Sequence, residues 1–278
     1  MSRALIDGQW GDSLPLDDRG LHYGDGLFET LALRDGRPCL WELHLARLQR
    51  GCRRLGLVPP WPAQLLEDVT RLAARHGDGV VKLMLTRGSG RRGYQVEPGA
   101  AGRRLAIWSP APAWPETHFR EGVRLRICRT RLSCNPELAG IKHLNRLENV
   151  LARREWDDAR IAEGLMLDEA GRVVEGVMSN VFLVRGGELL TPELSRCGVA
   201  GVMRAHILEI ASALGIAYRI DSVDLDELRE ADEVFLSNSL IGIWPVRELL
   251  DRRFDTDAGN PLTRRLQQAV AEHCLASP

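Results

Sequence analysis

One lysine, Lys142, stands where a segment broken by proline and glycine gives way to a predicted helix. Leu144, Leu147 and Leu151 follow it at helical spacing, which predicts a helix with one packed face. We therefore expect Lys142 at or just before the first turn, where unpaired backbone N–H groups carry partial positive charge. That field lowers the pKa of an amine, and a neutral amine is the form that attacks a carbonyl. The alternative is an ordinary solvated lysine beside a helix.

A carboxylate in a strand-like stretch is the second candidate. Alternation places Glu175 on one face with Val173 and Val177, while the opposite face is also apolar. A carboxylate in such surroundings either lies at an exposed edge or has a specific partner. One such partner is the protonated ring nitrogen of pyridoxal 5'-phosphate (PLP), which acts as an electron sink. The residues alone leave both interpretations open.

A phosphate site is predicted where Gly201-Val202-Met203-Arg204 opens a helix. Bare N–H groups at a helix N-terminus suit a phosphate, and Gly198 and Gly201 leave the approach uncluttered. Ser237-Asn238-Ser239 ends a predicted strand and offers hydroxyl and amide donors. Arg47 could add a charge-assisted bond, or it could be one of several solvated arginines.

The stretch from Gly88 to Gly93 matches the Gly-x-Gly-x-x-Gly pattern of dinucleotide-binding loops. That fingerprint must also open a helix, and Pro98-Gly99 forbids a long one, so we set this interpretation aside. The loop gathers Arg91, Arg92 and Tyr94, which suits the binding of carboxylates. A surface hairpin loop without a function is the alternative.

Composition excludes several classes of function. The 37 basic and 38 acidic residues nearly balance, which argues against nucleic-acid or membrane binding. No apolar stretch is long enough to span a membrane, and the N-terminus carries no secretory signal pattern. The six cysteines lack Cys-x-x-Cys and metal-ligand spacing, so we expect reduced thiols, no metal and a cytoplasmic location.

Strands and helices that mix without regular alternation predict an α+β fold. Helices are expected at Trp41–Leu55, 61–76, 202–214 and 261–276, the last with Asn260 as its N-cap. Strands are expected at 4–6, 27–33, 80–86, 105–108, 123–128, 165–167, 173–184, 188–190 and 234–236. Three prolines within residues 109–115 mark a linker. We expect a small N-terminal α+β domain (1–109), a Pro-rich linker (110–120) and a larger α+β domain (121–278) that carries Lys142.

In this order, the segments resemble fold-type IV PLP enzymes. The resemblance lies in Ile-Lys-His-Leu-Asn-Arg-Leu-Glu around Lys142, Glu-Gly-x-x-Ser-Asn-Val-Phe from Glu175, Gly201-Val202-Met203-Arg204, and the early segment Asp18 to Thr30. It runs from Ile6 to about Val246. The group includes branched-chain aminotransferases, D-amino acid aminotransferases and lyases.

The resemblance implies two α/β domains with the cofactor between them and a homodimer whose second subunit completes the site. The Arg87–Tyr94 loop is our candidate for that contribution. By the same resemblance, Lys142 holds PLP covalently and Glu175 contacts the ring nitrogen. The resemblance also implies that the phosphate is bound by the backbone N–H groups of Val202 and Met203 and by three further residues, Arg47, Asn238 and Ser239.

Within the group, the loop and the lysine segment are most similar to lyases that convert 4-amino-4-deoxychorismate to 4-aminobenzoate and pyruvate in folate biosynthesis. Arg92-Gly93-Tyr94 stands where D-amino acid aminotransferases typically carry Arg-x-His, and Gly201-Val202-Met203 where branched-chain enzymes carry Gly-Ile-Thr. Lys142 then acts as the base, and the two substrate carboxylates are assigned to Arg91, Arg92, Tyr94 and Arg146. The alternative is a fold-type IV aminotransferase of D- or branched-chain amino acids. A non-catalytic binding module is disfavoured, because the lysine and the glutamate are both present.

Overall fold

The computed structural model describes residues 3–97, 99–100, 102–256 and 261–276, with side chains as far as residue 272. It divides into two compact units, which are described separately. Unit 1 contains Met1–Pro112 and Ile141–Asn145, and unit 2 contains Ala113–Gly140 and Arg146–Pro278. The first break between them falls inside the proline-rich segment 109–115. The predicted N-cap Asn260 lies outside the described residues.

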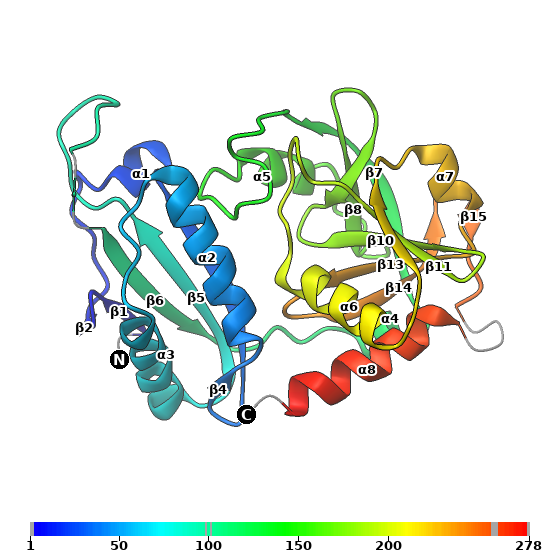
Figure 1. The fold of residues 1–278 in the computed structure, drawn as a ribbon, viewed down its shortest axis with the longest axis horizontal. Coiled ribbons are helices and arrows are strands. Elements are labelled where there is room, and N and C mark those ends of the chain that lie inside the picture. The colour runs from blue at the N-terminus through cyan, green and yellow to red at the C-terminus, as the bar shows by residue number, and fades with distance from the viewer. Residues whose placement is uncertain (1–2, 98, 101, 257–260, 277–278) are drawn as a thin grey trace. The chain divides into compact units, whose positions relative to one another are not determined.

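Unit 1 is an antiparallel sheet of six strands in the order β2-β1-β6-β5-β3-β4 (Figure 1). Its strands are β1 Ala4–Ile6, β2 Gln9–Trp10, β3 Gly26–Arg34, β4 Arg37–Pro38, β5 Gly79–Thr86 and β6 Arg103–Ser109, and its helices are α1 Arg19–Tyr23, α2 Trp41–Leu55 and α3 Pro62–His76. Along β3 and β5, alternate residues such as Leu31 and Leu83 are buried in one core with Val69 and Leu72 of α3. The opposite face of the sheet therefore carries the intervening side chains.

The segment that carries Lys142 belongs to unit 1, although the sequence places it in the C-terminal domain. The amide of Phe28 donates to the Lys142 carbonyl at 2.9 Å, and the Leu144 amide donates to the Gly26 carbonyl at 3.0 Å. These bonds extend the edge of β3, because β4 pairs only with the far end of that strand. A Cβ at Gly26 would lie 2.3 Å from the Leu85 carbonyl oxygen and 2.8 Å from Leu144 Cδ1, so this close pairing requires glycine.

The prediction that Lys142 lies at or just before the first turn of a helix was wrong. Helix α5 covers Leu147–Arg153 with Arg146 as its N-cap, so Lys142 lies five residues before the first helical position. The expected packed face is also wrong, because Leu147 and Leu151 are 76% and 51% exposed. The physical reason is that the backbone groups of residues 142–144 are used by β3 and are not available to a helical turn.

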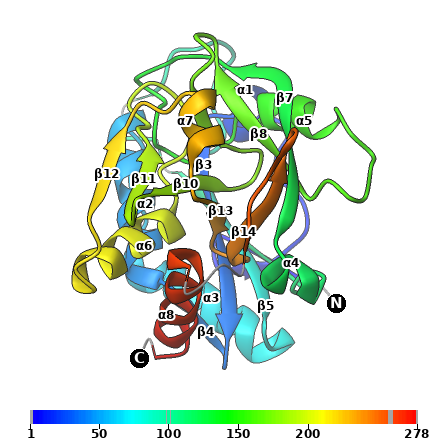
Figure 2. The ribbon, with the colours of Figure 1, turned by 90° about the vertical axis from the view of Figure 1, so that its right-hand side faces the viewer.

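Unit 2 is built on a mixed sheet of nine strands in the order β12-β11-β10-β13-β14-β7-β8-β9, with β15 paired to β14 (Figure 2). Its strands are β7 Val123–Leu132, β8 Glu163–Asp168, β9 Val173–Gly176, β10 Asn180–Arg185, β11 Glu188–Pro192, β12 Tyr218–Asp221, β13 Glu233–Asn238, β14 Gly242–Leu249 and β15 Arg252–Arg253. Its helices are α4 Glu116–Arg120, α5, α6 Val202–Ala213, α7 Leu225–Glu230 and α8 Leu262–Ala276.

The sheet of unit 2 curls on itself. Val173 of β9, the last strand in the order, forms a bridge with Val223, which follows the first strand β12. Trp244 is fully buried inside this curled sheet, and α6 and α8 lie side by side against it (Figure 2). The predicted α+β class is therefore confirmed.

Two local elements differ from the predicted ones. The expected strand 173–184 is split into β9 and β10, because the Gly176 amide donates to the Ser179 carbonyl at 2.7 Å and closes a tight turn. The short helix α4 occupies the second half of the predicted linker. Among the described residues, no helix combines the length and apolar character needed to cross a bilayer.

Candidate active site

Lys142 and Phe28 define the candidate reactive position in unit 1. The backbone bond between these residues fixes the base of the lysine side chain, and its Nζ lies 4.5 Å from the centroid of the Phe28 ring. The predicted field of a helix N-terminus does not act here, because α5 begins at Leu147. What positions the amine is therefore strand pairing and an aromatic ring.

A buried charge cluster lies between β3 and α2. Alternation along β3 turns Glu29 toward the helix, and His44 and Arg47 share one face of α2 because they are three residues apart. The Arg47 Nε donates to Glu29 at 2.8 Å, its Nη2 contacts the second carboxylate oxygen, and the His44 Nδ1 lies 2.6 Å from that same oxygen. Arg47 is only 5% exposed, so the interpretation as a solvated arginine was wrong.

The pKa shifts in this cluster follow from burial and pairing. Burial raises the pKa of Glu29, but Arg47 and His44 outweigh it and bring the value to about 2. Burial lowers the pKa of His44, which its bond to Glu29 only partly offsets. His44 is therefore neutral near pH 7 and donates its Nδ1 proton to Glu29. This pairing was not predicted from the sequence. The signal that could have predicted it is the His44-x-x-Arg47 spacing on one helix face together with a glutamate, Glu29, at a buried position of the preceding strand.

Glu175, in unit 2, is a buried carboxylate with a defined partner. It is 4% exposed, and the Val199 amide donates to its Oε2 at 2.8 Å. The Val199 carbonyl in turn accepts from Asn180 Nδ2 at 2.9 Å. Although β9 ends the sheet order, the exposed-edge interpretation was wrong, because the chain around Val199 covers this position.

Arg204 supplies positive charge near Glu175. Its Nε donates to the Thr191 hydroxyl at 3.1 Å and its Nη2 to the Pro192 carbonyl at 3.0 Å. Burial lowers the pKa of Arg204 to about 10, against the raising influence of the Glu175 charge. No role for Arg204 was predicted, since nothing local in the sequence shows that α6 turns this side chain toward β9 and β11.

The N-terminus of α6 is open. Gly201 is its N-cap, and no side chain among the described residues caps the helix there. A Cβ at Gly201 would lie 1.9 Å from Asn180 Oδ1, so only glycine allows this close approach. The first-turn N–H groups of Val202 and Met203 therefore form a cradle that suits a phosphate.

The turn that follows β13 is organised by Asn238. Its Oδ1 accepts from the amides of Leu240 at 2.8 Å and Ile241 at 3.0 Å, and its Nδ2 donates to the Met178 carbonyl at 3.0 Å. This side chain therefore shapes the turn that carries Ser239. The assignment of Asn238 and Ser239 to the phosphate stays a prediction.

The glycine-rich loop of unit 1 is anchored at one end and exposed at the other. Arg87 is buried, and its Nε and Nη2 donate to Asp25 at 2.7 and 2.9 Å. Arg91 and Tyr94 are by contrast exposed, and Arg91 pairs with Glu97 at 3.0 Å. No helix follows Gly93 among the described residues of the loop, which removes the dinucleotide interpretation. Arg92 is also exposed, and Arg146 is the N-cap of α5 in unit 2.

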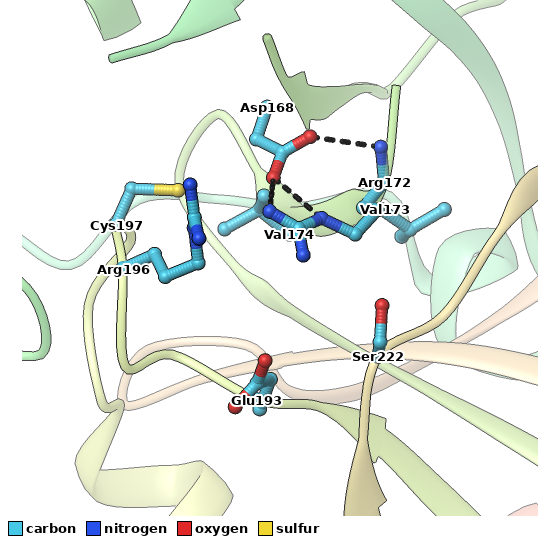
Figure 3. A pocket seen from close by; sticks show the side chains of 8 residues that line it. All are labelled: Asp168, Arg172, Val173, Val174, Glu193, Arg196, Cys197 and Ser222. Carbon is cyan, nitrogen blue, oxygen red and sulfur yellow. Dashed lines mark hydrogen bonds and ion pairs between the residues drawn. The ribbon is translucent and has the colours of Figure 1, made fainter. Parts of the chain in front are cut away.

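A small pocket in unit 2 is separate from these residues (Figure 3). It is lined by Asp168, Arg172, Val173, Val174, Glu193, Arg196, Cys197 and Ser222. Asp168 and Arg172 form an ion pair of 2.7 Å at its wall. No residue predicted for the site lines it, so this pocket is not the candidate active site.

Comparison with known proteins assigns the chain to a family. The sequence pattern of the amino-transferase class IV family matches residues 26–249. A crystal structure of 4-amino-4-deoxychorismate lyase from Pseudomonas aeruginosa is 54% identical, with a TM-score of 0.93, over 97% of this chain and 98% of that one. Aminodeoxychorismate lyase of Vibrio harveyi is 36% identical over 91% of this chain and 94% of its own length. D-alanine aminotransferase of Bacillus licheniformis is 27% identical over 95% of this chain and 93% of its own length. With its match over most of the sequence, this chain belongs to the amino-transferase class IV family.

Proposed function

We propose that this chain is a PLP-dependent lyase that converts 4-amino-4-deoxychorismate into 4-aminobenzoate and pyruvate. The observation that carries this proposal is the 54% identity to the Pseudomonas aeruginosa lyase over nearly the full length of both chains. An aminotransferase is the second candidate, because D-alanine aminotransferases are also similar to this chain over more than nine-tenths of its length.

The cofactor is PLP, and the described residues fit it. When bound, PLP supplies an aldehyde and a ring that takes up the charge of a deprotonated carbon. Lys142 would hold the aldehyde carbon, and the buried carboxylate of Glu175 would keep the ring nitrogen protonated. The phosphate would be held by a shared set of donors: Arg47, the N–H groups of Val202 and Met203, Asn238 and Ser239.

Lys142 carries the proton transfers. With the substrate amine bound at the cofactor, the Nζ of Lys142 would act as a neutral base and would remove the proton from the substrate carbon that bears nitrogen. The ether bond then breaks, the ring becomes aromatic, and the enolpyruvyl group leaves with its oxygen. Lys142 returns the proton to this group, which becomes pyruvate. Aromatisation makes the step favourable, so no further strong acid is required.

The substrate has two carboxylates, and we assign them to Arg91 or Arg92 with Tyr94 and Arg146. The loop residues are exposed in the single chain, which supports their contribution to a second copy in a homodimer. A cytoplasmic location is proposed with the same activity, since the substrate and product are small polar metabolites.

The test is a product assay with two arms. Purified protein supplied with 4-amino-4-deoxychorismate should release 4-aminobenzoate and pyruvate in equal amounts, whereas amino transfer to an added keto acid should be slow. Borohydride reduction should leave the cofactor mass on the peptide that contains Lys142 and not on the peptide that contains Lys82. Transfer without pyruvate release would favour the aminotransferase, and full turnover by Lys142→Ala would refute the mechanism.

A further inference from the structure

The β9–β10 turn (residues 176–179) lies between two side chains of the proposed cofactor site. Glu175 directly precedes the turn and Asn180 directly follows it. Asn180 Nδ2 donates to the Val199 carbonyl at 2.9 Å, and the Val199 amide donates to Glu175 Oε2 at 2.8 Å. Asn180 Oδ1 leaves room only for glycine at position 201, the N-cap of α6. The turn therefore sets the spacing between the carboxylate assigned to the ring nitrogen and the helix end assigned to the phosphate.

Two asparagine side chains from other elements hold the carbonyl groups of the β9–β10 turn. The Met178 carbonyl accepts from Asn238 Nδ2 at 3.0 Å, and the Val177 carbonyl accepts from Asn149 Nδ2 of α5 at 2.9 Å. Asn238 also organises the turn that carries Ser239, a second residue assigned to the phosphate. The β9–β10 turn is thus bonded to the segment after β13 as well as to the residues around α6.

Glu163, the first residue of β8, holds the β9–β10 turn through its N–H and O–H groups. This side chain is buried, and its Oε2 accepts from the Met178 amide at 3.1 Å and from the Ser179 hydroxyl at 3.0 Å. Its Oε1 accepts from the Gly164 amide at 3.0 Å. A Cβ at Gly176 would lie 2.3 Å from Ser179 Oγ and 3.2 Å from Glu163 Cγ, so this packing also requires glycine.

A buried carboxylate at this place is costly for folding. Among the described residues, the hydrogen-bond partners of Glu163 are backbone amides and a hydroxyl, and burial raises its pKa to about 7 against them. An apolar residue of similar size would avoid the cost of removing this group from water. Perturbed carboxyl groups of this kind are concentrated at functional sites. What the β9–β10 turn carries explains the carboxylate better than stability does.

We propose that Glu163 is a positioning residue that holds Met178 and Ser179 and thereby aligns Glu175 with the N-terminus of α6. The ring nitrogen and the phosphate of PLP are then bound at the correct separation. In this role Glu163 acts through the β9–β10 turn and exchanges no proton with the substrate. The inference rests on the proposed function and its cofactor contacts.

The test compares Glu163→Gln with a matched control, Asp168→Asn. Asp168 is a buried carboxylate at the other end of β8, and it holds the β8–β9 turn by accepting from the amides of Ala170 and Arg172, both at 2.9 Å (Figure 3). That turn carries no residue assigned to the cofactor. Each substitution keeps the length of the side chain and leaves one acceptor oxygen in place of two. The pair therefore separates positioning from a general structural role.

PLP titration into the cofactor-free proteins at pH 8, where Glu163 is ionised, is the first readout. Glu163→Gln should weaken the PLP affinity about 10-fold or more, the effect of losing a hydrogen bond to a charged group. Asp168→Asn should bind PLP as the wild type does. Urea unfolding of the same proteins shows that each variant is folded during the titration. If Glu163→Gln fails to fold, Ser179→Ala takes its place, because it removes the donor instead of the acceptor.

Steady-state kinetics at saturating PLP are the second readout. Glu163→Gln should lower kcat about 10-fold and leave the KM for 4-amino-4-deoxychorismate nearly unchanged, because the β9–β10 turn carries none of the residues assigned to the substrate carboxylates. Glu175→Gln, which alters the direct contact to the cofactor, is the reference and should lower kcat at least as much.

The outcomes distinguish this inference from the proposed function. A loss in Glu175→Gln with none in Glu163→Gln would overturn the positioning role alone, and so would equal losses in Glu163→Gln and Asp168→Asn. No loss in Glu175→Gln would refute the cofactor contacts and the positioning role together. Weakened PLP affinity in Glu163→Gln, with a wild type that releases no 4-aminobenzoate, would refute the lyase function and support the role of Glu163.

Discussion

Replacing Glu29 with glutamine should destabilise the protein strongly, although Glu29 contacts no predicted reacting atom. The carboxylate is 1% exposed, and it accepts bonds from Arg47 and His44, which are 5% and 1% exposed. Glu29→Gln leaves the buried guanidinium without this carboxylate. Removing one partner of a buried ion pair costs about 3–5 kcal/mol. The shift of the Glu29 pKa from 4.5 to about 2 corresponds to roughly 3 kcal/mol, which agrees in size.

The assay is urea unfolding of the cofactor-free protein at pH 7, followed by far-ultraviolet circular dichroism. Glu67→Gln is the matched control, because Glu67 is an exposed residue of α3, and its change should stay within about 0.5 kcal/mol. Adding Arg47→Met should cost less in the Glu29→Gln background than in the wild type, because the two residues are coupled.

The pH dependence of the same pair has a definite sign. A carboxylate whose pKa is lowered on folding contributes stability that is present above pH 4.5 and lost as the pH falls toward 2. The wild type should therefore lose stability across that window more steeply than Glu29→Gln. A loss below about 1 kcal/mol at pH 7, or strictly additive effects of the two substitutions, would refute the view that the charge cluster holds β3 against α2.

Two further predictions concern unit 2. Burial raises the pKa of Glu163 to about 7, although the Met178 amide and the Ser179 hydroxyl donate to its carboxylate. The stabilising contribution of this group is therefore complete below pH 4.5 and is lost as the pH rises through 7, so the free energy of unfolding should fall by about 3 kcal/mol between pH 5 and pH 8. Glu163→Gln should abolish this fall, and an equal pH dependence of the unfolding free energy in both proteins would contradict the prediction. Gly201→Ala places a Cβ 1.9 Å from Asn180 Oδ1, so PLP titration into the cofactor-free variant should give an affinity at least roughly tenfold weaker, and unaltered affinity would exclude the open cradle at α6.

Local sequence pattern determined the elements whose stability comes from their own periodicity. Helix α2 begins at Trp41 and ends at Leu55 as its apolar spacing and Gly56 predict, because amphipathic spacing and a glycine stop act within a few residues. The same kind of pattern gave a wrong prediction after Lys142. Leu144 lies before α5, and Leu147 and Leu151 lie within it, but the two helical leucines are exposed and form no packed face. There the backbone is held by Gly26 and Phe28, which are more than a hundred residues away.

The sequence by itself determined which residue types are available: a lysine in a broken segment, a glutamate among apolar residues and a helix that opens with glycine. Only the tertiary structure decided their partners. Glu175 is held by Val199, Arg47 by Glu29, and Lys142 shares the ring of Phe28 with Lys82. The Glu175 pair forms where a loop covers β9, and the other pairs form by helix packing or strand register between segments that are apart in the sequence. Composition and spacing carry no record of such contacts, because the free energy that selects them comes from burial of the assembled unit.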